Sequence, residues 1–197
     1  MKIILASASL SRQQMLKNAG VNFEVIPASI PEEKNINQHA VEIALNLARQ
    51  KALYISEKHP QNLIIGSDQV LEYNGQILSK PLNHYNAFLQ IKSLQNNHHR
   101  LFSAVAIALN NKIIWADFDS ASLYMKKLRD QEIEEYLTEA GEEIFNCVGS
   151  YQIEKQGSNL FTNIIGDNFT IMGMPLLRLL TFLKDHLVDK SLAKPEN

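Results

Sequence analysis

The chain has 197 residues, of which 45% are hydrophobic, and a protein of this size can bury a substantial core. Its 19 basic and 21 acidic residues give a net charge of −2, which argues against general binding to nucleic acid. Every apolar run stops well short of the roughly 18 residues that a membrane-spanning helix needs. One cysteine, Cys147, excludes an internal disulfide and favours a reducing compartment. We therefore expect a cytoplasmic protein without a nucleic-acid or membrane partner.

The first half of the chain alternates between strand and helix patterns. Ser11 can cap a helix that Gly20 ends, and a long apolar repeat at helical spacing stops at Pro60. Asn74-Gly75 between two apolar runs is the strongest short hairpin motif. The expected elements are strands over 2–7, 21–27 and 62–68, helices over 11–20 and 37–60, and a hairpin over 70–81.

The second half continues this alternation. Asn83 can cap a helix, and Asn110-Asn111 between two apolar runs predicts a second hairpin turn. The other expected elements are helices over 83–94 and 130–138, strands within 101–128, strands with turns at Gly157 and Gly166-Asp167 within 150–171, a closing helix from Pro175, and a frayed tail over 189–197. Together these elements predict an α/β fold with a mixed sheet and flanking helices, in a single domain over 1–197.

The end of the first strand carries residues that suit an anion. Ser7, Ser9 and Ser11 place hydroxyl groups around a helix start, and Arg12 enters the first helical turn. A helix N-terminus offers free N–H groups and the positive end of a dipole, and an arginine adds a fork of donors for phosphate. The alternative is that the serines only cap the helix and Arg12 is a surface charge.

Four charged residues stand at or near the ends of predicted elements: Glu32, Lys51, Asp68 and Lys80. Burying a carboxylate such as Asp68 is costly unless it is paired or bound to metal, and Gly66 before it allows a close approach to the backbone. Each residue alone is explained by a solvated surface or a loop. As a set, the carboxylates of Glu32 and Asp68 suit Mg²⁺ or Mn²⁺, and the lysines suit phosphate.

Other chemistry lacks support in the sequence. There is no G-x-x-x-x-G-K-[ST] stretch for a Walker-type phosphate loop and no G-x-G-x-x-G stretch for a dinucleotide. His98-His99 lies in the polar segment "QNNHHR", which we interpret as an exposed turn rather than a metal-ligand pair. Cys147 is interpreted as a buried, inert thiol.

Five blocks of the sequence together resemble the Maf family, also called septum-formation inhibitor proteins. They are "LASASLSRQQMLKNAG", "PASIPEE", "LARQKA", "IGSDQVLEYNGQILSKP" and "GDNFTIMGMPL", and the resemblance covers the chain from Ile3 to about Leu183. It implies two lobes around a central cleft, as in the inosine-triphosphatase-like fold, a divalent metal and often a homodimer. It also implies that a nucleoside triphosphate is hydrolysed to the monophosphate and pyrophosphate.

The resemblance assigns roles to the four charged residues. Asp68 matches the family's general base, and Glu32, Lys51 and Lys80 match its other site positions. The implied mechanism places Mg²⁺ or Mn²⁺ between Glu32, Asp68 and the triphosphate, while water attacks the α-phosphorus. Lys51, Lys80 and Arg12 would stabilise the charge that develops. Whether Asp68 is mainly a base or mainly a metal ligand stays open.

The departures from the family pattern bear on the substrate. The usual S-P-R-R is Ser9-Leu10-Ser11-Arg12 here, and D-K-A-G is replaced by 146–149, which read N-C-V-G. Gln69 and Glu154 resemble the branch that acts on 7-methyl-GTP, although that branch usually has Trp where Ser11 stands. We therefore expect Ser11, Gln69 and Glu154 to determine base specificity.

Three other functions are considered. A pyrophosphatase that prefers dTTP or UTP is the alternative substrate class. A nucleotide-binding regulator of septum formation with little turnover is suggested by the family's older name, but the charged residues of the site are intact. A nucleic-acid-binding module is disfavoured by the net charge of −2.

Overall fold

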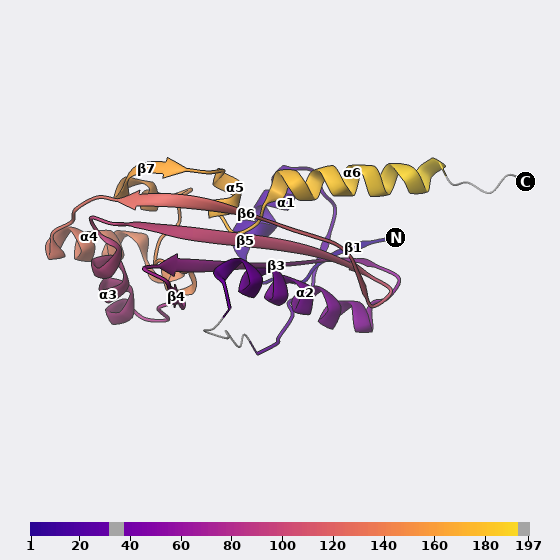
Figure 1. Ribbon diagram of the computed structural model, residues 1–197, viewed down its shortest axis with the longest axis horizontal. Helices are drawn as coiled ribbons and strands as arrows, with labels where there is room; N and C mark the ends of the chain where they lie inside the picture. The colour runs from indigo at the N-terminus through magenta and orange to yellow at the C-terminus, as the bar shows by residue number, and fades with distance from the viewer. Residues whose placement is uncertain (32–37, 193–197) are drawn as a thin grey trace, which may run out of the picture.

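The computed structural model describes residues 1–31 and 38–192. In this part of the chain, helices and strands alternate along most of the sequence, as predicted (Figure 1). The strands are β1 (Ile3–Leu5), β2 (Glu24–Val25), β3 (Leu63–Tyr73), β4 (Gln76–Leu78), β5 (His98–Leu109), β6 (Lys112–Met125) and β7 (Phe161–Ile165). The α-helices are α1 (Leu10–Asn18), α2 (Ala40–Lys58), α3 (His84–Leu94), α4 (Asp130–Ala140), α5 (Asn168–Ile171) and α6 (Leu176–Leu192). Two short 3-10 helices, η1 (Glu142–Asn146) and η2 (Gln156–Leu160), complete the set.

The strands form one mixed sheet in the order β2-β1-β3-β5-β6-β7, with β4 paired to the far part of β3. β1 is parallel to β2 and β3, and the other pairs are antiparallel. Figure 1 shows β3, β5 and β6 as long strands, with α2 on one side of the sheet and α1 and α6 on the other. The predicted α/β fold with a mixed sheet and flanking helices is confirmed.

The turns and the helix cap that short sequence motifs predicted are present in the structure. Asn74-Gly75 joins β3 to β4 with φ angles of 50° and 74°, and Asn110-Asn111 joins β5 to β6 with φ angles of 51° and 60°. These positive φ angles are what tight hairpin turns require, and asparagine and glycine tolerate them best. The Asn83 side chain accepts a hydrogen bond from the Asn86 backbone N–H at 2.9 Å and caps α3.

The first two predicted elements differ from the structure. α1 begins at Leu10, and its cap is Ser9, whose Oγ accepts from the Arg12 backbone N–H. The prediction that Ser11 caps this helix is wrong, because Ser11 already lies inside the first turn. The second strand is confined to Glu24–Val25, an exposed edge strand whose one neighbour among the described residues is β1.

The third strand does not end at Asp68 but continues to Tyr73. β5 pairs with β3 without interruption from Ile64 to Glu72, so the backbone stays extended past the carboxylate. Asp68 therefore lies in the middle of a long strand rather than at its end.

The region 150–171 contains less strand than predicted. Only Phe161–Ile165 is a strand, and η2 and α5 occupy much of the remainder. The turn at Gly166-Asp167 leads into α5 because the Asp167 carboxylate accepts from the Thr170 backbone N–H at 3.0 Å. The closing helix follows Pro175 as predicted, but it continues to Leu192, so the helix covers the first part of the predicted tail.

His98-His99 is not an exposed turn. Both residues belong to β5, and the side chain of His99 is 1% exposed. The polar neighbours in "QNNHHR" concealed a strand whose alternate residues face the core, since His99 and Leu101 point to the same side.

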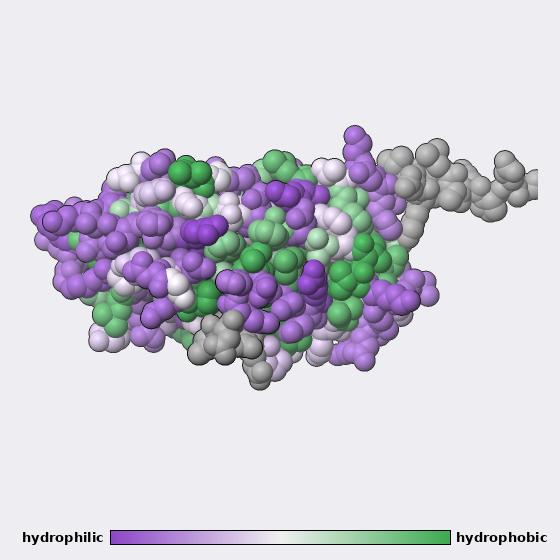
Figure 2. All heavy atoms as spheres, viewed as in Figure 1, coloured by the Kyte–Doolittle hydropathy of each residue, from purple (hydrophilic) through white to green (hydrophobic). Residues whose placement is uncertain are grey.

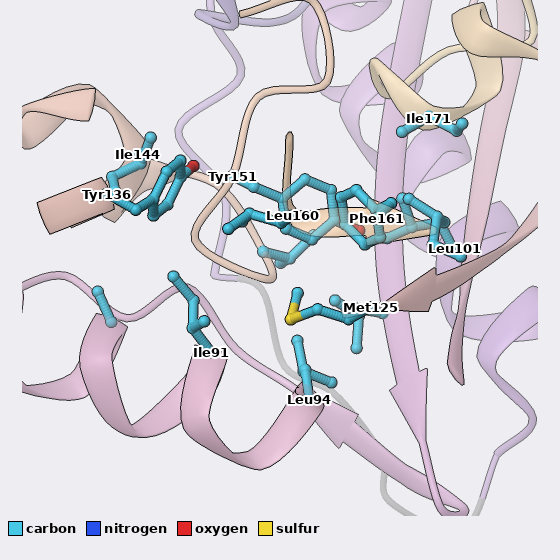
Figure 3. Close-up of a cluster of buried hydrophobic side chains, with 14 of the residues drawn as sticks. Ile91, Leu94, Leu101, Met125, Tyr136, Ile144, Tyr151, Leu160, Phe161 and Ile171 are labelled. Carbon is cyan, nitrogen blue, oxygen red and sulfur yellow. The ribbon is translucent and has the colours of Figure 1, made fainter. Parts of the chain in front are cut away.

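The core has three parts. On one face of the sheet, α2 packs against residues such as Ile64 and Val70, and on the other face α1 and α6 pack against residues such as Leu63 and Ile65. The third part lies where α3, α4 and the segment around Tyr151 cover the far end of β3, β5 and β6 (Figure 3). The sheet is therefore shared by two lobes, one with α1, α2 and α6 and one with α3 and α4.

The surface agrees with this arrangement. In the view of Figure 2, hydrophilic residues cover most of the lobe that contains α3 and α4, while smaller apolar areas lie toward the centre and the other lobe. Among the helices described here, none combines the length and the apolar character that crossing a membrane requires.

Candidate active site

The site lies where β3 has no neighbouring strand on one of its edges. β1 pairs with β3 as far as Leu5 and Ile65, and β4 joins the same edge only from Leu71. Within the described residues, no strand pairs with this edge between Ile65 and Leu71. Successive residues of a strand point to opposite faces, so the gap gives access to both Asp68 and Gln69.

Two adjoining cavities open at this gap. The first measures about 520 Å³ and the second about 470 Å³, and each lies within the range of small-molecule sites. The first has an apolar end, formed by Leu101, Val148, Tyr151 and Ile171. The second has a polar end next to the start of α1. Both cavities are lined by Ser9, Ser11, Arg12, Lys51, Lys80, Asn146, Cys147 and Gln152.

Asp68 is paired with Lys51 at the edge of the first cavity. Lys51 Nζ donates to Asp68 Oδ1 at 2.6 Å, and the two side chains are only 9% and 7% exposed. A carboxylate in this position needs a partner because burying an isolated charge is costly. The structure brings together two of the residues that the sequence predicted, and it supplies a direct contact that the spacing of 17 residues could not reveal.

Because Gly66 has no side chain, α2 can approach β3 closely enough for Lys51 to reach Asp68. A Cβ atom at Gly66 would stand 2.2 Å from the Ala48 carbonyl oxygen and 2.6 Å from the Ala52 backbone nitrogen. The backbone of α2 therefore lies directly against β3, two residues before Asp68. Lys51 lies between Ala48 and Ala52 on α2, so this close approach sets the distance from Lys51 to Asp68.

Arg12 is bound on several sides. Its Nε donates to the Gly173 carbonyl at 2.8 Å, and one terminal nitrogen donates to the Ser67 carbonyl at 3.0 Å and to Ser7 Oγ at 3.1 Å. The side chain is 9% exposed and lines both cavities. Arg12 therefore connects α1, β3 and the turn before α6, and its positive charge faces the site.

The three serines have different partners. Ser7 Oγ accepts from Arg12 and from the Ser9 backbone N–H, and Ser9 caps α1. Ser11 Oγ donates to Glu154 Oε1 at 2.8 Å. Ser9 and Ser11 line both cavities, whereas Ser7 lines the second cavity. The serines stay candidates for contacts with phosphate.

The orientation of the Gln69 amide follows from its neighbours. Gln69 Nε2 donates to the carbonyls of Thr170 and Ile171 at 3.1 and 2.9 Å, and to Ser103 Oγ at 3.1 Å. Carbonyl oxygens only accept, so the amide nitrogen must be the atom on this side. Gln69 can therefore offer only its Oε1 to a ligand, as an acceptor. From the sequence, donor and acceptor roles were both open.

Glu154 and Lys80 lie at the rim. Glu154 is exposed, lines the first cavity and stands in a turn rather than a strand. Lys80 lines both cavities, beside Cys147. The Cys147 thiol is half-buried rather than buried, and burial is the main cause that raises its pKa. A thiol with a raised pKa stays protonated and is a poor nucleophile, in agreement with an inert cysteine.

A metal ion would find a limited set of ligands here. Glu32 lies outside the described residues. Among residues 1–31 and 38–192, no group of three or more His, Cys, Asp or Glu side chains is placed to hold an ion. Mg²⁺ is usually bound by one or two carboxylates together with substrate phosphates and water. Asp68 fits that mode, since its Oδ1 binds Lys51 and its Oδ2 has no protein partner among the described residues.

Several lining residues were not selected from the sequence. Leu101 and Ile171 line the apolar end, and Gly173 accepts from Arg12. Ile171 and Gly173 belong to "GDNFTIMGMPL", so only the family resemblance could have indicated them. Leu101 carries no chemical feature that distinguishes it from a core residue.

The chain is similar to a family of known proteins. The family model "Maf-like protein" matches residues 2–186. The "Nucleoside triphosphate pyrophosphatase" of Rhodopseudomonas palustris (strain BisB18) is 41% identical over 187 residues, covering 92% of each chain. The protein of the same name from Bradyrhizobium diazoefficiens is also 41% identical, with the same coverage. A nucleoside-triphosphatase / dITP/XTP pyrophosphatase structure from Mycobacterium abscessus has a TM-score of 0.40 and 17% identity, covering 65% of this chain and 76% of that one.

Proposed function

Because this chain belongs to the Maf-like protein family, we propose that it is a nucleoside triphosphate pyrophosphatase, which hydrolyses its substrate to a monophosphate and pyrophosphate. The observation that carries the proposal is the buried pair of Asp68 and Lys51 at the junction of two cavities. A carboxylate that is paired with a lysine beside a ligand-sized cavity is suited to accept a proton.

The two cavities suit the two halves of such a substrate. The apolar end of the first cavity, with Leu101 and Tyr151, would receive the base. The polar end of the second would receive the phosphates, near the start of α1. Arg12, Lys51 and Lys80 line both cavities, so their positive charges would lie along the triphosphate.

In the proposed reaction, Asp68 orients a water molecule and accepts its proton as the oxygen attacks the α-phosphorus. The bond between the α-phosphorus and the bridging oxygen breaks, and pyrophosphate leaves. Lys51 holds Asp68 in place through Oδ1, so Oδ2 is the atom left for the water. Lys80 and Arg12 would stabilise negative charge on the phosphate oxygens.

We also propose that the reaction depends on Mg²⁺ or Mn²⁺. Glu32, the second carboxylate that the family resemblance indicates, and the substrate phosphates would hold the ion, and Asp68 would act on it through the water that Oδ2 orients. When bound, such an ion neutralises phosphate charge and lowers the pKa of a coordinated water. Turnover should then disappear with a chelator and return when the ion is added in excess. The homodimer and the cytoplasmic location stay predictions.

The substrate we propose is 7-methyl-GTP. Gln69 offers only an acceptor, and Glu154 offers a carboxylate at the rim of the same cavity. Two acceptors match the N1–H and 2-amino donors of guanine, whereas uracil and thymine have one such N–H donor. A 7-methylguanine ring also carries a positive charge that a nearby carboxylate attracts.

The activity is tested by pyrophosphate release from 7-methyl-GTP, GTP, ATP, dTTP and UTP. Asp68→Asn should lower turnover by about 10²–10⁴-fold, the usual contribution of a positioned acid–base group. The matched control is Asp130→Asn, because Asp130 also pairs with a lysine, at 2.7 Å, but on the surface. Wild-type turnover in Asp68→Asn, or nucleotide binding without turnover in the wild type, would contradict the proposal. The second result would favour a regulator.

The substrate preference is tested with Glu154→Gln. A lost charge-assisted contact is worth about 1.5–3 kcal/mol, so the ratio of kcat/KM for 7-methyl-GTP over UTP should fall by about tenfold or more. Glu139→Gln removes an exposed carboxylate elsewhere and should leave the ratio unchanged. A wild-type preference for dTTP or UTP would overturn the substrate and leave the pyrophosphatase reaction intact.

A further inference from the structure

The hydrogen bond between His99 and Tyr151 is not used by the mechanism above. His99 Nε2 lies 2.7 Å from the Tyr151 hydroxyl, and the two side chains come from segments 52 residues apart. The residues are 1% and 5% exposed. A polar contact at this depth needs a reason, because an apolar pair of similar shape would fill the same space without the desolvation cost.

Tyr151 connects this contact to the site. It lines the apolar end of the first cavity, together with Leu101 and Ile171. Figure 3 shows Tyr151 beside Phe161 and Leu160, and the rings of Tyr151 and Phe161 meet edge to face with centroids 4.9 Å apart. Tyr151 therefore forms part of both the core and the wall of the cavity.

The turn that delivers Tyr151 is unusual in its backbone. Gly149 and Ser150 have φ angles of 84° and 62°, and a Cβ at Gly149 would lie 2.4 Å from Tyr151 Cε1. Ser150 Oγ donates to Gln90 Oε1, and the Tyr136 hydroxyl donates to the Ser150 carbonyl. Contacts with α3 and α4 therefore hold the backbone of the turn. The hydroxyl end of the Tyr151 ring is held separately, by His99.

His99 is neutral under ordinary conditions. Burial, and to a lesser extent His98, lowers its pKa to about 4, and burial raises the pKa of Tyr151 well above its usual value. The neutral imidazole carries one N–H proton and the phenol carries one O–H proton, but the two side chains share one hydrogen bond. His99 Nδ1 has no partner within the described residues. This arrangement costs free energy in the folded state, which is expected of a contact kept for geometry rather than for stability.

We propose that His99 is a positioning residue: by holding the Tyr151 hydroxyl it fixes the aromatic wall against which the base of the substrate packs. This inference rests on the proposed function, since it assumes that the apolar end receives a base. His99 does not touch the substrate. It acts through Tyr151, whose ring offers a flat face to a planar ligand.

The test compares three variants of the full chain. His99→Leu removes the hydrogen bond, His99→Gln keeps a polar group near the position of Nε2, and Tyr151→Phe removes the hydroxyl but keeps the ring. Each is titrated calorimetrically with an α,β-methylene analogue of GTP, which is not cleaved, and with inorganic tripolyphosphate, which has no base. Steady-state kinetics on the best substrate follows.

We expect His99→Leu and Tyr151→Phe to weaken binding of the GTP analogue by about three- to tenfold, the worth of one hydrogen bond. Their double variant should be no weaker than either single one, because both remove the same contact. His99→Gln should recover most of the affinity. Binding of tripolyphosphate should be unchanged in all of these variants. The fall in kcat/KM should come from a higher KM, while kcat stays the same.

Equal losses for the analogue and tripolyphosphate, or unchanged affinity for the analogue in Tyr151→Phe, would overturn the inference. If His99→Leu does not fold, Tyr151→Phe and His99→Gln decide the question. A wild-type protein that binds the analogue but hydrolyses no nucleotide would refute the proposed activity while the binding comparison still tests His99.

Discussion

Several charged and polar side chains of the candidate site are held by specific partners. Lys51 and Asp68 pair at 2.6 Å, and Gln69 is oriented by the carbonyls of Thr170 and Ile171. In the proposed reaction, such contacts would hold the reacting groups in place before substrate arrives, which would lower the cost of reaching a productive geometry. The same contacts make single residues at this depth matter for stability as well as activity.

At the residue scale, stability should depend on pH through His99. Burial lowers its pKa to about 4 from a usual value of 6.5, so the unfolded state takes up a proton first as the pH falls. Stability is fully present above pH 6.5 and is lost progressively as the pH falls through 4. A shift of this size corresponds to roughly 3 kcal/mol.

The measurement is the free energy of unfolding in urea at pH 7, 5.5 and 4. His99→Gln cannot be protonated, so it should lose about 3 kcal/mol less than the wild type between pH 7 and pH 4. His59→Gln, at the half-buried C-terminal cap of α2, provides the histidine control. Parallel pH profiles for the wild type and His99→Gln would show that His99 is protonated equally in both states.

At the element scale, the contact between α2 and β3 has no space for a side chain at Gly66. Gly66→Ala would place a methyl group 2.2 Å from the Ala48 carbonyl oxygen, and backbone atoms cannot move aside cheaply. We expect a loss of about 3 kcal/mol in stability, as for other overpacked cores. The new methyl group would push α2 away from β3, and this shift would move Lys51 away from Asp68. Turnover should therefore also fall.

Thermal unfolding and pyrophosphate release test this expectation together. The control is Gly75→Ala in the β3–β4 turn, where the new methyl group meets nothing within 4 Å but φ is +74°. It should cost about 1–2 kcal/mol of backbone strain and leave turnover per folded molecule unchanged. If Gly66→Ala behaves like Gly75→Ala, the close packing of α2 does not control the site.

The outer edge of β6 is a second feature at this scale. β7 pairs only with the last part of β6, so in the described residues no strand covers the edge from Lys112 to Ala121. The carboxylates of Asp117 and Asp119 accept from the backbone N–H groups of Phe118 and Ser120, both at 2.8 Å. These N–H groups are therefore unavailable to another strand, which is one way in which proteins prevent edge-to-edge association.

Removing both carboxylates should allow this strand edge to pair with strands of other molecules. Arg178 on α6 donates to Asp117 and Asp119 at 3.1 and 3.3 Å, so the double variant Asp117→Ala/Asp119→Ala also releases that arginine. We expect species larger than those of the wild type in sedimentation velocity at equal concentration. Glu139→Ala/Glu142→Ala removes the same charge at exposed positions of the other lobe. Identical distributions for both double variants would mean that the edge is not protected by these residues.

At the scale of the whole molecule, the site exists because distant parts of the chain meet at the gap in β3. Arg12 binds Gly173, 161 residues away, and Ser11 binds Glu154, 143 residues away. The first contact ties the N-terminal helix to the turn before α6, and the second reaches across the first cavity toward the other lobe. These contacts define the cleft between the lobes.

Arg12 and Lys80 should therefore differ when each is replaced by alanine. Arg12→Ala removes at least the hydrogen bonds to Gly173, Ser67 and Ser7 and should destabilise the fold by about 3 kcal/mol or more. Lys80→Ala should leave the melting temperature within a degree or two, while it weakens triphosphate binding and slows turnover. Lys127→Ala, at an exposed position outside the site, should change neither. Equal effects of all three substitutions on turnover would show that only overall charge matters.

The sequence by itself determined the local structure and the family. The Asn74-Gly75 and Asn110-Asn111 turns and the Asn83 cap were predictable because short-range sterics and hydrogen bonds set their geometry. Where a longer-range effect competed, the prediction was wrong: β3 continued past Asp68 because β5 pairs with it throughout. The five blocks taken together, rather than any local pattern, indicated the Maf resemblance that the family model confirmed.

Only the tertiary structure decided how the site is built. It paired Asp68 with Lys51, oriented the amide of Gln69 and buried His99 against Tyr151. The sequence contains each of these residues but not their distances, because the path of the chain joins positions that lie 17 to 101 residues apart. Glu32 lies outside the described residues, so its role as a metal ligand stays a prediction. Side-chain partners over such separations follow from the packing of helices on the sheet, which no local motif specifies.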